Sequence, residues 1–401
     1  MFRSILAFIK KETVLVIAGL LAIVSCFIIH PDAAYAGYIN YRVLGLLFCL
    51  MTVVAGMKEA GFFDALSRAL ISRVHTTRQI SLLLVFLSFV LSMFLTNDVT
   101  LVTVVPFTML VFAGIQDSAD DLLFTLIFET VAANLGSMLT PFGNPQNLYL
   151  YSAYDFSMNE FIGIMLPYTL LSIALIAVFT ALFCGRRKPR REKHGMHGED
   201  GVLSPEATGN ARADRVTRSS VHAGDVMPLR TGSFVFYLIF FLAALLAVAR
   251  VLDYRILLAV TIAAVLIKDR KILLRVDYSL LVTFIFFFVF IGNIGRADAV
   301  QNFLRSIMEG RETLTAILAS QVVSNVPAAL LLSGFTKNGA ALVIGTNLGG
   351  LGTLIASMAS LITYKLFAEQ NAESRGRYLL HFTWINVLFL GLLYGFYLLI
   401  R

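Results

Sequence analysis

Long apolar runs dominate the chain, and most of them are bounded by short polar loops. Seven runs have roughly membrane-spanning length, about 17 to 25 residues or somewhat fewer, and predict transmembrane helices. They lie near residues 13–29, 43–57, 161–184, 231–249, 254–267, 278–295 and 378–400. This pattern is typical of an all-α polytopic membrane protein.

Four further apolar runs are interrupted by polar or glycine-rich residues. Two of them, 79–115 and 313–335, break at "TNDVT" and "SNVPA" and predict re-entrant helical hairpins. The other two, 122–154 and 339–367, break at "ANLGSMLTPFGNPQN" and "TNLGGLGT". Because Gly and Pro cannot continue a regular helix cheaply, these two segments predict discontinuous transmembrane helices. We expect about 10 to 11 membrane segments plus the two hairpins.

The same features occur in the same order in two parts of the chain. Residues 1–184 and 231–401 each hold an apolar helix, a hairpin and a discontinuous helix. The segment 185–230 between them opens with "GRRKPRREKHGMHGED" and predicts a disordered linker. The sequence therefore predicts two transmembrane repeats joined by this linker.

Individual residues match across the two parts. Asn97 in the first hairpin corresponds to Asn325 in the second, and Asn134 in the first discontinuous helix corresponds to Asn347. Four matched features in one order are hard to obtain from membrane-like composition alone. They indicate an internal repeat.

Basic residues predict how the chain is oriented. If the N-terminus lies inside and each hairpin enters and leaves on one side, the inside segments carry 24 of the 32 Lys and Arg residues. This bias follows the positive-inside rule. The N-terminus and linker 185–230 are then cytoplasmic and the C-terminus is outside. The two repeats are inverted, with the first hairpin opening inward and the second outward.

Composition supports the membrane assignment and limits the partners. Hydrophobic residues make up 58% of the chain and charged residues only 14%. The net charge of +7 comes from basic residues in short loops and the linker, so it indicates topology rather than nucleic-acid binding. Cys26, Cys49 and Cys184 are isolated and form no metal spacing or disulfide framework. The first apolar run resembles a signal peptide, but the topology requires it as a helix.

Polar groups at helix breaks predict a transport site. Broken helices at membrane depth leave backbone groups unpaired, which is tolerated only inside protein or beside a water-filled cavity. Two discontinuous helices facing two polar hairpin tips are typical of a secondary transporter with its site near the bilayer midplane. Freed carbonyl groups can coordinate a small cation there, and helix N-termini can face an anion.

Two acidic residues are candidates for coupling. Of the 25 Asp and Glu residues, only Asp98 and Glu129 lie within predicted spans. A carboxylate in the membrane is costly enough to suggest a function by default. The alternative for Asp98 is a structural cap on the broken helix. Neither Asp98 nor Glu129 has an acidic counterpart in the second repeat, where Val326 occupies the place of Asp98.

No signature of an enzyme was found. The sequence contains no zinc-protease motif, no nucleotide-binding loop and no serine nucleophile with a plausible histidine partner. Transport must then be driven by an ion gradient or be passive, and no cofactor is expected besides a sodium ion or a proton. An intramembrane enzyme and a passive channel remain as alternatives of a different class.

The paired tips, each followed by a Gly/Asn-rich interrupted helix, resemble an ion-transporter superfamily. It includes arsenite permeases, sodium/proton antiporters, citrate transporters and divalent anion/sodium symporters. The resemblance covers nearly the whole chain outside the linker. It implies two inverted repeats of five helices plus a hairpin, a scaffold part that often mediates dimers, and a transport part that moves as an elevator. We therefore expect a homodimer in the cytoplasmic membrane.

The dicarboxylate branch of that superfamily carries Ser-Asn-Thr at its hairpin tips, and those residues bind sodium and substrate. Thr96 and Asn97 match the first two positions of one tip. The third position departs from the pattern, with Asp98 in one tip and Val326 in the other. A carboxylate there would repel a dicarboxylate unless it were protonated or paired. The first tip looks more like that of the arsenite permeases, while "GNPQN" looks like that of uncharacterised permeases.

These arguments predict a secondary active transporter, coupled to sodium or protons, for a small anion or oxyanion, working by an elevator mechanism. The alternative is a sodium/proton antiporter in which Asp98 exchanges the two cations. The expected ion-binding residues are Thr96, Asn97, Asp98, Gly136, Ser137 and Gly143 in the first repeat and Ser324, Asn325, Thr346, Asn347 and Gly350 in the second. Substrate is expected near Asn97, Asp98, Thr140, Asn325 and Pro327.

Overall fold

The described part of the chain is built almost entirely of helices. The computed structural model describes residues 12–62, 65–66, 76–113, 115, 118–185, 229–297, 302 and 305–401. Apart from Gly185, Leu229 and Arg230, the predicted linker 185–230 lies outside these residues. The three cysteines are free thiols.

The helices follow the order predicted from the apolar runs. In the first half they are α2 (Thr13–Ile28), α3 (Tyr35–Tyr38), α4 (Tyr41–Glu59), α6 (Thr77–Phe94), α7 (Asn97–Ala113), α8 (Ala119–Gly136), η1 (Ser137–Leu139), α9 (Pro145–Ala153) and α10 (Met158–Phe183). In the second half they are α12 (Thr231–Val248), α13 (Tyr254–Asp269), η2 (Arg270–Arg275), α14 (Tyr278–Ile294), α16 (Glu312–Val323), α17 (Asn325–Ser333), α18 (Gly339–Leu348), α19 (Met358–Gln370), η3 (Ala372–Ser374) and α20 (Arg375–Ile400).

The structure confirms a polytopic helical membrane protein. Among the described residues, six helices are long and apolar enough to cross a membrane, or seven if α13 and α14, bent by 74° at their junction, count as one span. Four shorter apolar helices, including α7, α16 and α18, belong mainly to the interrupted segments. The expected number of 10 to 11 membrane segments stays a prediction.

The four interrupted runs form paired helices. Helices α6 and α7 form the first hairpin and α16 and α17 the second, while α8 and α9, and α18 and α19, are the halves of the discontinuous helices. Local sequence explains where two of the long helices begin. Thr76 and Gln79 form a reciprocal capping box at the start of α6, and Ser157 and Glu160 do the same for α10.

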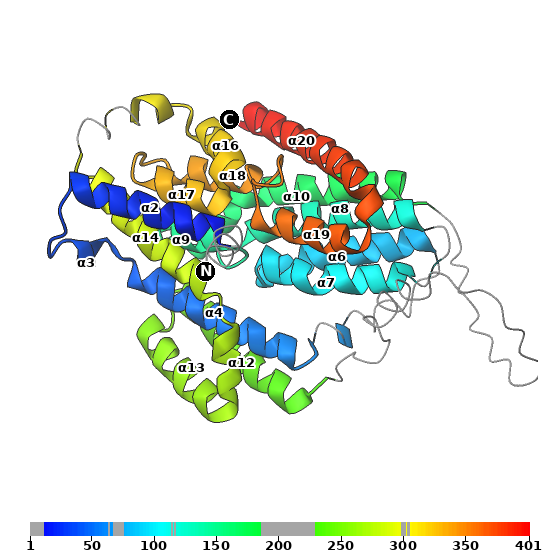
Figure 1. Cartoon of the computed structure of the whole chain (residues 1–401), viewed down its shortest axis with the longest axis horizontal. Coiled ribbons are helices and arrows are strands. Elements are labelled where there is room, and N and C mark those ends of the chain that lie inside the picture. The colour runs from blue at the N-terminus through cyan, green and yellow to red at the C-terminus, as the bar shows by residue number, and fades with distance from the viewer. Residues whose placement is uncertain are drawn as a thin grey trace, which may run out of the picture.

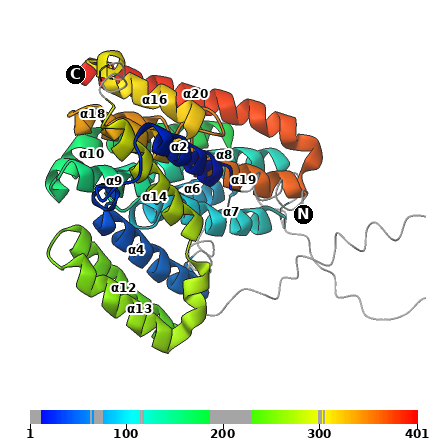
Figure 2. The ribbon, with the colours of Figure 1, turned by 60° about the vertical axis from the view of Figure 1, so that its left-hand side comes forward.

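The helices divide into two groups that share few contacts. Helix α4 packs on α12 and α13, and α14 packs on α2; we call α2–α4 and α12–α14 the scaffold group. The hairpins, the discontinuous helices, α10 and α20 pack on one another and form the core group. In Figures 1 and 2, α12 and α13 lie beyond α4 at one edge of the molecule. The main contacts between the groups are those of α4 with α9 and of α14 with α17.

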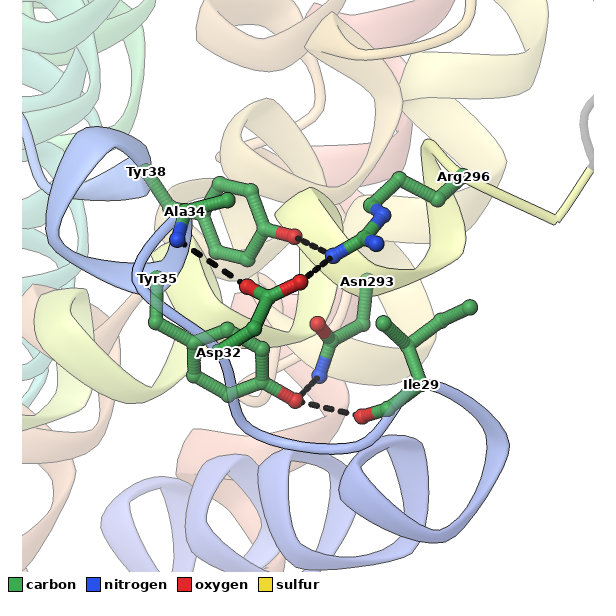
Figure 3. A network of polar contacts seen from close by, with 7 residues as sticks. All are labelled: Ile29, Asp32, Ala34, Tyr35, Tyr38, Asn293 and Arg296. Atoms are coloured by element: carbon green, nitrogen blue, oxygen red, sulfur yellow. Dashed lines mark hydrogen bonds and ion pairs between the residues drawn. The ribbon is translucent and has the colours of Figure 1, made fainter.

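A polar network fastens the segment after α2 to the end of α14 (Figure 3). The Arg296 guanidinium lies 2.8 Å from a carboxylate oxygen of Asp32 and donates to the Tyr38 hydroxyl at 3.1 Å. The Asn293 amide donates to the Tyr35 hydroxyl, which donates to the Ile29 carbonyl. The hydrogen bond from Arg296 lowers the pKa of Asp32 below its ordinary value. These bonds stabilise the scaffold group at one end.

Four ion pairs test the predicted sidedness. Asp32 pairs with Arg296 and Asp155 with Arg250, and all four residues lie in segments that the charge pattern assigned to the outside. Two further pairs join segments assigned to the inside, Glu59 with Arg275 and Asp120 with Arg377. Each pair therefore joins segments expected on one side of the membrane.

The open ends of the two hairpins lie at opposite ends of the molecule. At the start of α6, the Thr77 hydroxyl donates to the carbonyl of Gly185, which follows the end of α10. After the end of α17, the Thr336 carbonyl accepts from Tyr154, which precedes α10. Because α10 is a 26-residue helix, its two ends lie at opposite faces of the protein. Opposite entry is what inverted repeats require, although inversion of the complete halves stays a prediction.

Candidate transport site

Equivalent contacts hold the two helix breaks against the two hairpins. The Thr140 hydroxyl in the first break donates to the carbonyl of Met93, near the end of α6, at 2.5 Å. The Thr353 hydroxyl in the second break donates to the carbonyl of Gln321, near the end of α16, at 3.3 Å. Met93 and Gln321 each lie four residues before the asparagine of their own hairpin tip. The two halves therefore repeat their local contacts.

Two glycines make the same close approach in both halves. A Cβ at Gly136 would overlap the Ser92 hydroxyl on α6, and a Cβ at Gly349 would overlap the Ser320 hydroxyl on α16. Only glycine permits this packing of broken helix on hairpin. Gly136, an expected ion-binding residue, is thus required by packing whatever its carbonyl does.

The first tip is tied to the first discontinuous helix by a pair of asparagines. Thr96 lies at the start of α7, where its hydroxyl accepts from the Val99 N–H at 3.4 Å. The Asn97 Nδ2 donates to Oδ1 of Asn134 at 2.9 Å, and the Asn97 Oδ1 accepts from the Asp98 N–H. Both asparagines are buried. Asn97, an expected ion-binding residue, is therefore in direct contact with Asn134 of the first discontinuous helix.

The second tip has an unusual backbone. Ser324 adopts φ 74° and ψ 157°, a region that residues other than glycine rarely occupy. Its hydroxyl is within 3.4 Å of Asn325 Oδ1 and 3.3 Å of the Ala356 carbonyl. The Asn325 N–H donates to that same carbonyl at 3.0 Å. The carbonyl of Ala356 thus holds this turn in place, and Gly350 lies against the Asn325 amide.

Two consecutive residues connect the two tips. Ala356 accepts from the second tip, and Ser357, the next residue, donates from its hydroxyl to Asn134 Oδ1 at 2.9 Å. Asn134 in turn accepts from Asn97 in the first tip. The two tips, which are more than 220 residues apart in sequence, therefore converge on the start of α19.

The discontinuous helices also bond to each other in a matched way. The Asn134 amide lies 3.4 Å from the Ser360 hydroxyl, and the Asn347 amide donates to Asn147 Oδ1 at 2.7 Å. Asn147 lies 13 residues after Asn134, and Ser360 lies 13 residues after Asn347. Each asparagine on the first half-helix of one repeat thus contacts the second half-helix of the other.

The first break is itself held by amide groups. The Ser137 hydroxyl donates to the Asn134 carbonyl at 2.9 Å and accepts from the Asn144 amide at 2.7 Å. The Asn147 amide donates to the carbonyls of Ser137, Met138 and Thr140. The loop between η1 and α9 is therefore ordered by side chains that replace the missing helical hydrogen bonds.

The segments that form the two helix breaks contain carboxylates but no basic side chain. No Lys, Arg or His occurs from Asn97 to Tyr154 or from Asn338 to Tyr364. Asp98 is half-buried in the first turn of α7, where the positive end of the helix dipole favours a negative charge. Glu129 is fully buried on α8; its Oε1 accepts from the Thr108 hydroxyl on α7 at 2.5 Å, and its Oε2 has no partner among the described residues.

The predicted site residues are only partly gathered by the structure. Asn97, Ser137, Ser324, Asn325 and Asn347 belong to the connected polar network. The Thr346 hydroxyl donates to the Leu342 carbonyl of its own helix, and Pro327 is packed inside α17. Gly143 lies against the Ser137 backbone. Among the described residues no group of three or more His, Cys, Asp or Glu could hold a metal ion.

Ser357 and Ser360 were not predicted, although the sequence held a signal for them. Asn144 follows Asn134 by ten residues, and Ser357 follows Asn347 by ten. Aligning "NPQNL" with "SMASL" by this spacing pairs Asn144 with Ser357 and Asn147 with Ser360. The serines were missed because only the Gly/Asn-rich parts of the two breaks were compared.

Comparison with known proteins identifies the family of this chain. The model of the citrate transporter family matches residues 5–340, which include both hairpins and the whole first discontinuous helix. The chain belongs to this family. This member of the citrate transporter family is therefore a membrane transporter and not an enzyme, as predicted.

Three curated relatives extend the comparison. An uncharacterised transporter of Methanocaldococcus jannaschii is 33% identical over 356 residues, 88% of this chain and 88% of the relative. The inner membrane protein YbiR of Escherichia coli is 29% identical over 380 residues, 94% and 92% of the two chains. The Na+/H+ antiporter NhaD of Vibrio parahaemolyticus is 30% identical over 190 residues, 45% of each chain.

Proposed function

We propose that this protein is a secondary active transporter that moves a small anion or an oxyanion acid together with sodium ions or protons. The observation that carries the proposal is the convergence of both hairpin tips on Ala356 and Ser357. Sites of secondary transporters lie between discontinuous helices near the bilayer midplane. The family description, citrate transporter, also supports an anionic substrate.

The two ion sites would use neutral oxygen atoms. In the first, Thr96, Asn97 and Ser137 lie beside the interrupted end of α8. In the second, Ser324, Asn325 and Asn347 lie beside the interrupted end of α18. Carbonyl and hydroxyl oxygens suit a hard cation such as sodium, and no basic side chain nearby opposes its binding. A bound cation would also balance the charge of an anion placed between the tips.

The division into two groups of helices supports an elevator mechanism. Most packing lies within the scaffold group or within the core group, while α4 with α9 and α14 with α17 form the main contacts between them. A small interface is what sliding of one body against the other requires. The core group would carry the site across the membrane, and the scaffold group would provide the homodimer contact.

The alternative is a sodium/proton antiporter. Asp98 and Glu129 are carboxylates inside the helical core, and part of the chain is similar to the antiporter NhaD. Either carboxylate could release a proton when sodium binds. Glu129 suits this role because one of its oxygens lacks a partner among the described residues. In this alternative no anion would be needed.

Localisation follows from the same arguments. We place the protein in the cytoplasmic membrane, with the N-terminus and segment 185–230 in the cytoplasm and the C-terminus outside. The similar inner membrane protein of Escherichia coli supports the compartment. The excess of Lys and Arg in the segments assigned to the inside supports the orientation.

Proteoliposomes containing the purified protein test the proposal. Imposed sodium or proton gradients are expected to drive accumulation of labelled citrate, phosphate or arsenite, one solute per experiment. Acidification-linked sodium flux without any added anion would remove the symport assignment and favour the antiporter. Ionic currents far above transporter turnover rates would instead indicate a channel.

A further inference from the structure

Gln146 is a buried amide that the protein does not satisfy. It is the second residue of α9 and only 1% exposed, yet neither its Oε1 nor its Nε2 has a hydrogen-bond partner among the described residues. Among the described residues, Gln146 is the one residue with two buried, unpaired side-chain atoms. Burying an unpaired amide costs free energy, which a ligand that pairs with both atoms would offset.

Two neighbouring asparagines present free oxygens in the same network. The Oδ1 atoms of Asn144 and Asn347 are buried and unpaired among the described residues. Hydrogen bonds fix both amides in these orientations. The Asn144 amide donates to Ser137 Oγ, whose own proton goes to a carbonyl, and the Asn347 amide donates to the Val343 carbonyl. The two free atoms are therefore oxygens and not nitrogens.

These side chains belong to one small region. Asn144 and Gln146 are separated only by Pro145, at the start of α9. Asn347 bonds to Asn147, the residue after Gln146, at 2.7 Å. The region thus combines three acceptor oxygens with one amide donor group, next to the N-terminal end of a nine-residue helix.

The balance of donors and acceptors restricts the ligand. A fully ionised anion has only acceptors, so it would leave three oxygens unpaired and near negative charge. A bare cation would satisfy the oxygens but not the Gln146 amide. An undissociated oxyacid with several hydroxyl groups carries an O–H donor for each free oxygen and acceptor oxygens for the Gln146 amide, and it needs no basic side chain. Among the solutes of the proposed function, it can pair with every free atom.

We propose that Gln146, with the free Oδ1 atoms of Asn144 and Asn347, binds the hydroxyl groups of an undissociated oxyacid, so the protein selects a weak acid in its undissociated form. This inference rests on the proposed transport function. It makes Gln146 a specificity-determining residue. The corresponding residue in the second repeat is Ala359, so the preference resides in one repeat only.

The first test measures stability without solute. Gln146→Leu and Gln146→Ala are expected to melt at or above the temperature of the native protein in detergent, because each removes an unpaired buried amide. The matched control is Asn147→Leu, which removes a donor to three carbonyls and is expected to lower the melting temperature. A fall in the melting temperature of the Gln146 variants as large as that of this control would overturn the inference.

The second test measures solute binding at neutral pH. Boric acid and arsenious acid, which are undissociated, are compared with citrate and phosphate, which are ionised. The native protein is expected to bind at least one undissociated acid. Gln146→Leu is expected to bind that acid with an affinity lower by about tenfold or more. Failure of both undissociated acids to bind, or equal affinity in native and variant proteins, would overturn the inference.

Proteoliposome uptake separates this inference from the proposed function. If the native protein moves none of the four solutes under sodium or proton gradients, the proposed function fails. If it moves an ionised solute and Gln146→Leu does so equally well, the function stands and only the role of Gln146 is lost. Uptake of an undissociated acid that is lost in Gln146→Leu supports both.

Discussion

The hydroxyl of Ser357 donates to Oδ1 of Asn134 at 2.9 Å, across 223 positions of sequence. Asn134 also accepts from Asn97 in the first hairpin tip, and the residue before Ser357 accepts from the second tip. This one contact therefore links both tips and both discontinuous helices. A short series of hydrogen bonds and one peptide link therefore joins the two tips.

The tip asparagines are expected to be essential for transport but not for folding. Asn97→Ala and Asn325→Ala should each lower ion-coupled uptake by about tenfold or more, because each removes a side-chain oxygen of a proposed ion site. The loss of a buried polar group should cost about 1–3 kcal/mol of stability and leave the protein folded. Size-exclusion profiles should remain monodisperse. The control is Asn338→Ala, which removes an exposed cap of α18 and should cost about 1 kcal/mol of stability with uptake retained. Full uptake in both tip variants would remove the site assignment.

Asp98→Asn tests whether this carboxylate carries the proton. The variant keeps the size of the side chain and removes its titration, so uptake should lose its pH dependence while sodium dependence is retained. Uptake is measured from about pH 5.5 to 8.5, around the physiological range in which coupling groups titrate. The control is Asp120→Asn, whose exposed carboxylate pairs with Arg377 and should leave the pH profile unchanged. An unaltered profile in Asp98→Asn would assign the coupling elsewhere.

The backbone of Ser324 predicts an opposition between stability and activity. Residues other than glycine in this region cost about 1–3 kcal/mol, so Ser324→Gly should raise the free energy of unfolding by roughly 1 kcal/mol. Uptake should fall because the hydroxyl at the tip is lost. Ser324→Ala, which keeps the strain and loses the hydroxyl, should lower uptake without the gain in stability. Chemical denaturation in detergent measures the stability of both variants, and equal stability of the two would contradict the argument.

The Asp155–Arg250 ion pair joins the core group to the scaffold group and should affect rate more than stability. Both residues have positive φ, 57° and 65°, and the guanidinium also lies over the Tyr151 ring. Asp155 is 83% exposed, so breaking the pair should change stability by less than about 1 kcal/mol. Uptake by Asp155→Ala should change several-fold if the groups slide, and the exchange Asp155→Arg with Arg250→Asp should restore the native rate. Identical rates in all variants would mean that this contact persists during transport.

Acid should weaken the end of the scaffold group shown in Figure 3. The pKa of Asp32 is lowered by its hydrogen bond from Arg296. The stabilisation is therefore present above the unfolded value of about 3.9 and is lost as pH falls through the lower folded value. Melting temperatures of native protein and Asp32→Asn should differ near neutral pH and converge in strong acid. A difference that persists at the lowest pH would show that the carboxylate charge is not the cause.

Much of the architecture could be predicted because apolar periodicity and helix-breaking residues act locally. The hairpins 79–115 and 313–335 and the breaks in 122–154 and 339–367 all appear where glycine, proline and asparagine interrupt apolar runs. The contact of Asn97 with Asn134 was seen only in the structure, because the sequence matched each of them to its counterpart in the other repeat. The lining of the site was less predictable, since Ser357 and Ser360 look like ordinary polar residues until α19 is packed against α7 and α8.

The sequence by itself determined that the chain is helical, crosses a membrane and repeats its polar interruptions, because these properties depend on composition and local backbone chemistry. Only the tertiary structure decided which amide atoms are paired. The side chains of Asn134 and Asn147 form hydrogen bonds within the protein. The side chain of Gln146 and the Oδ1 atoms of Asn144 and Asn347 have no partner among the described residues. That difference arises from long-range packing, which no local pattern records.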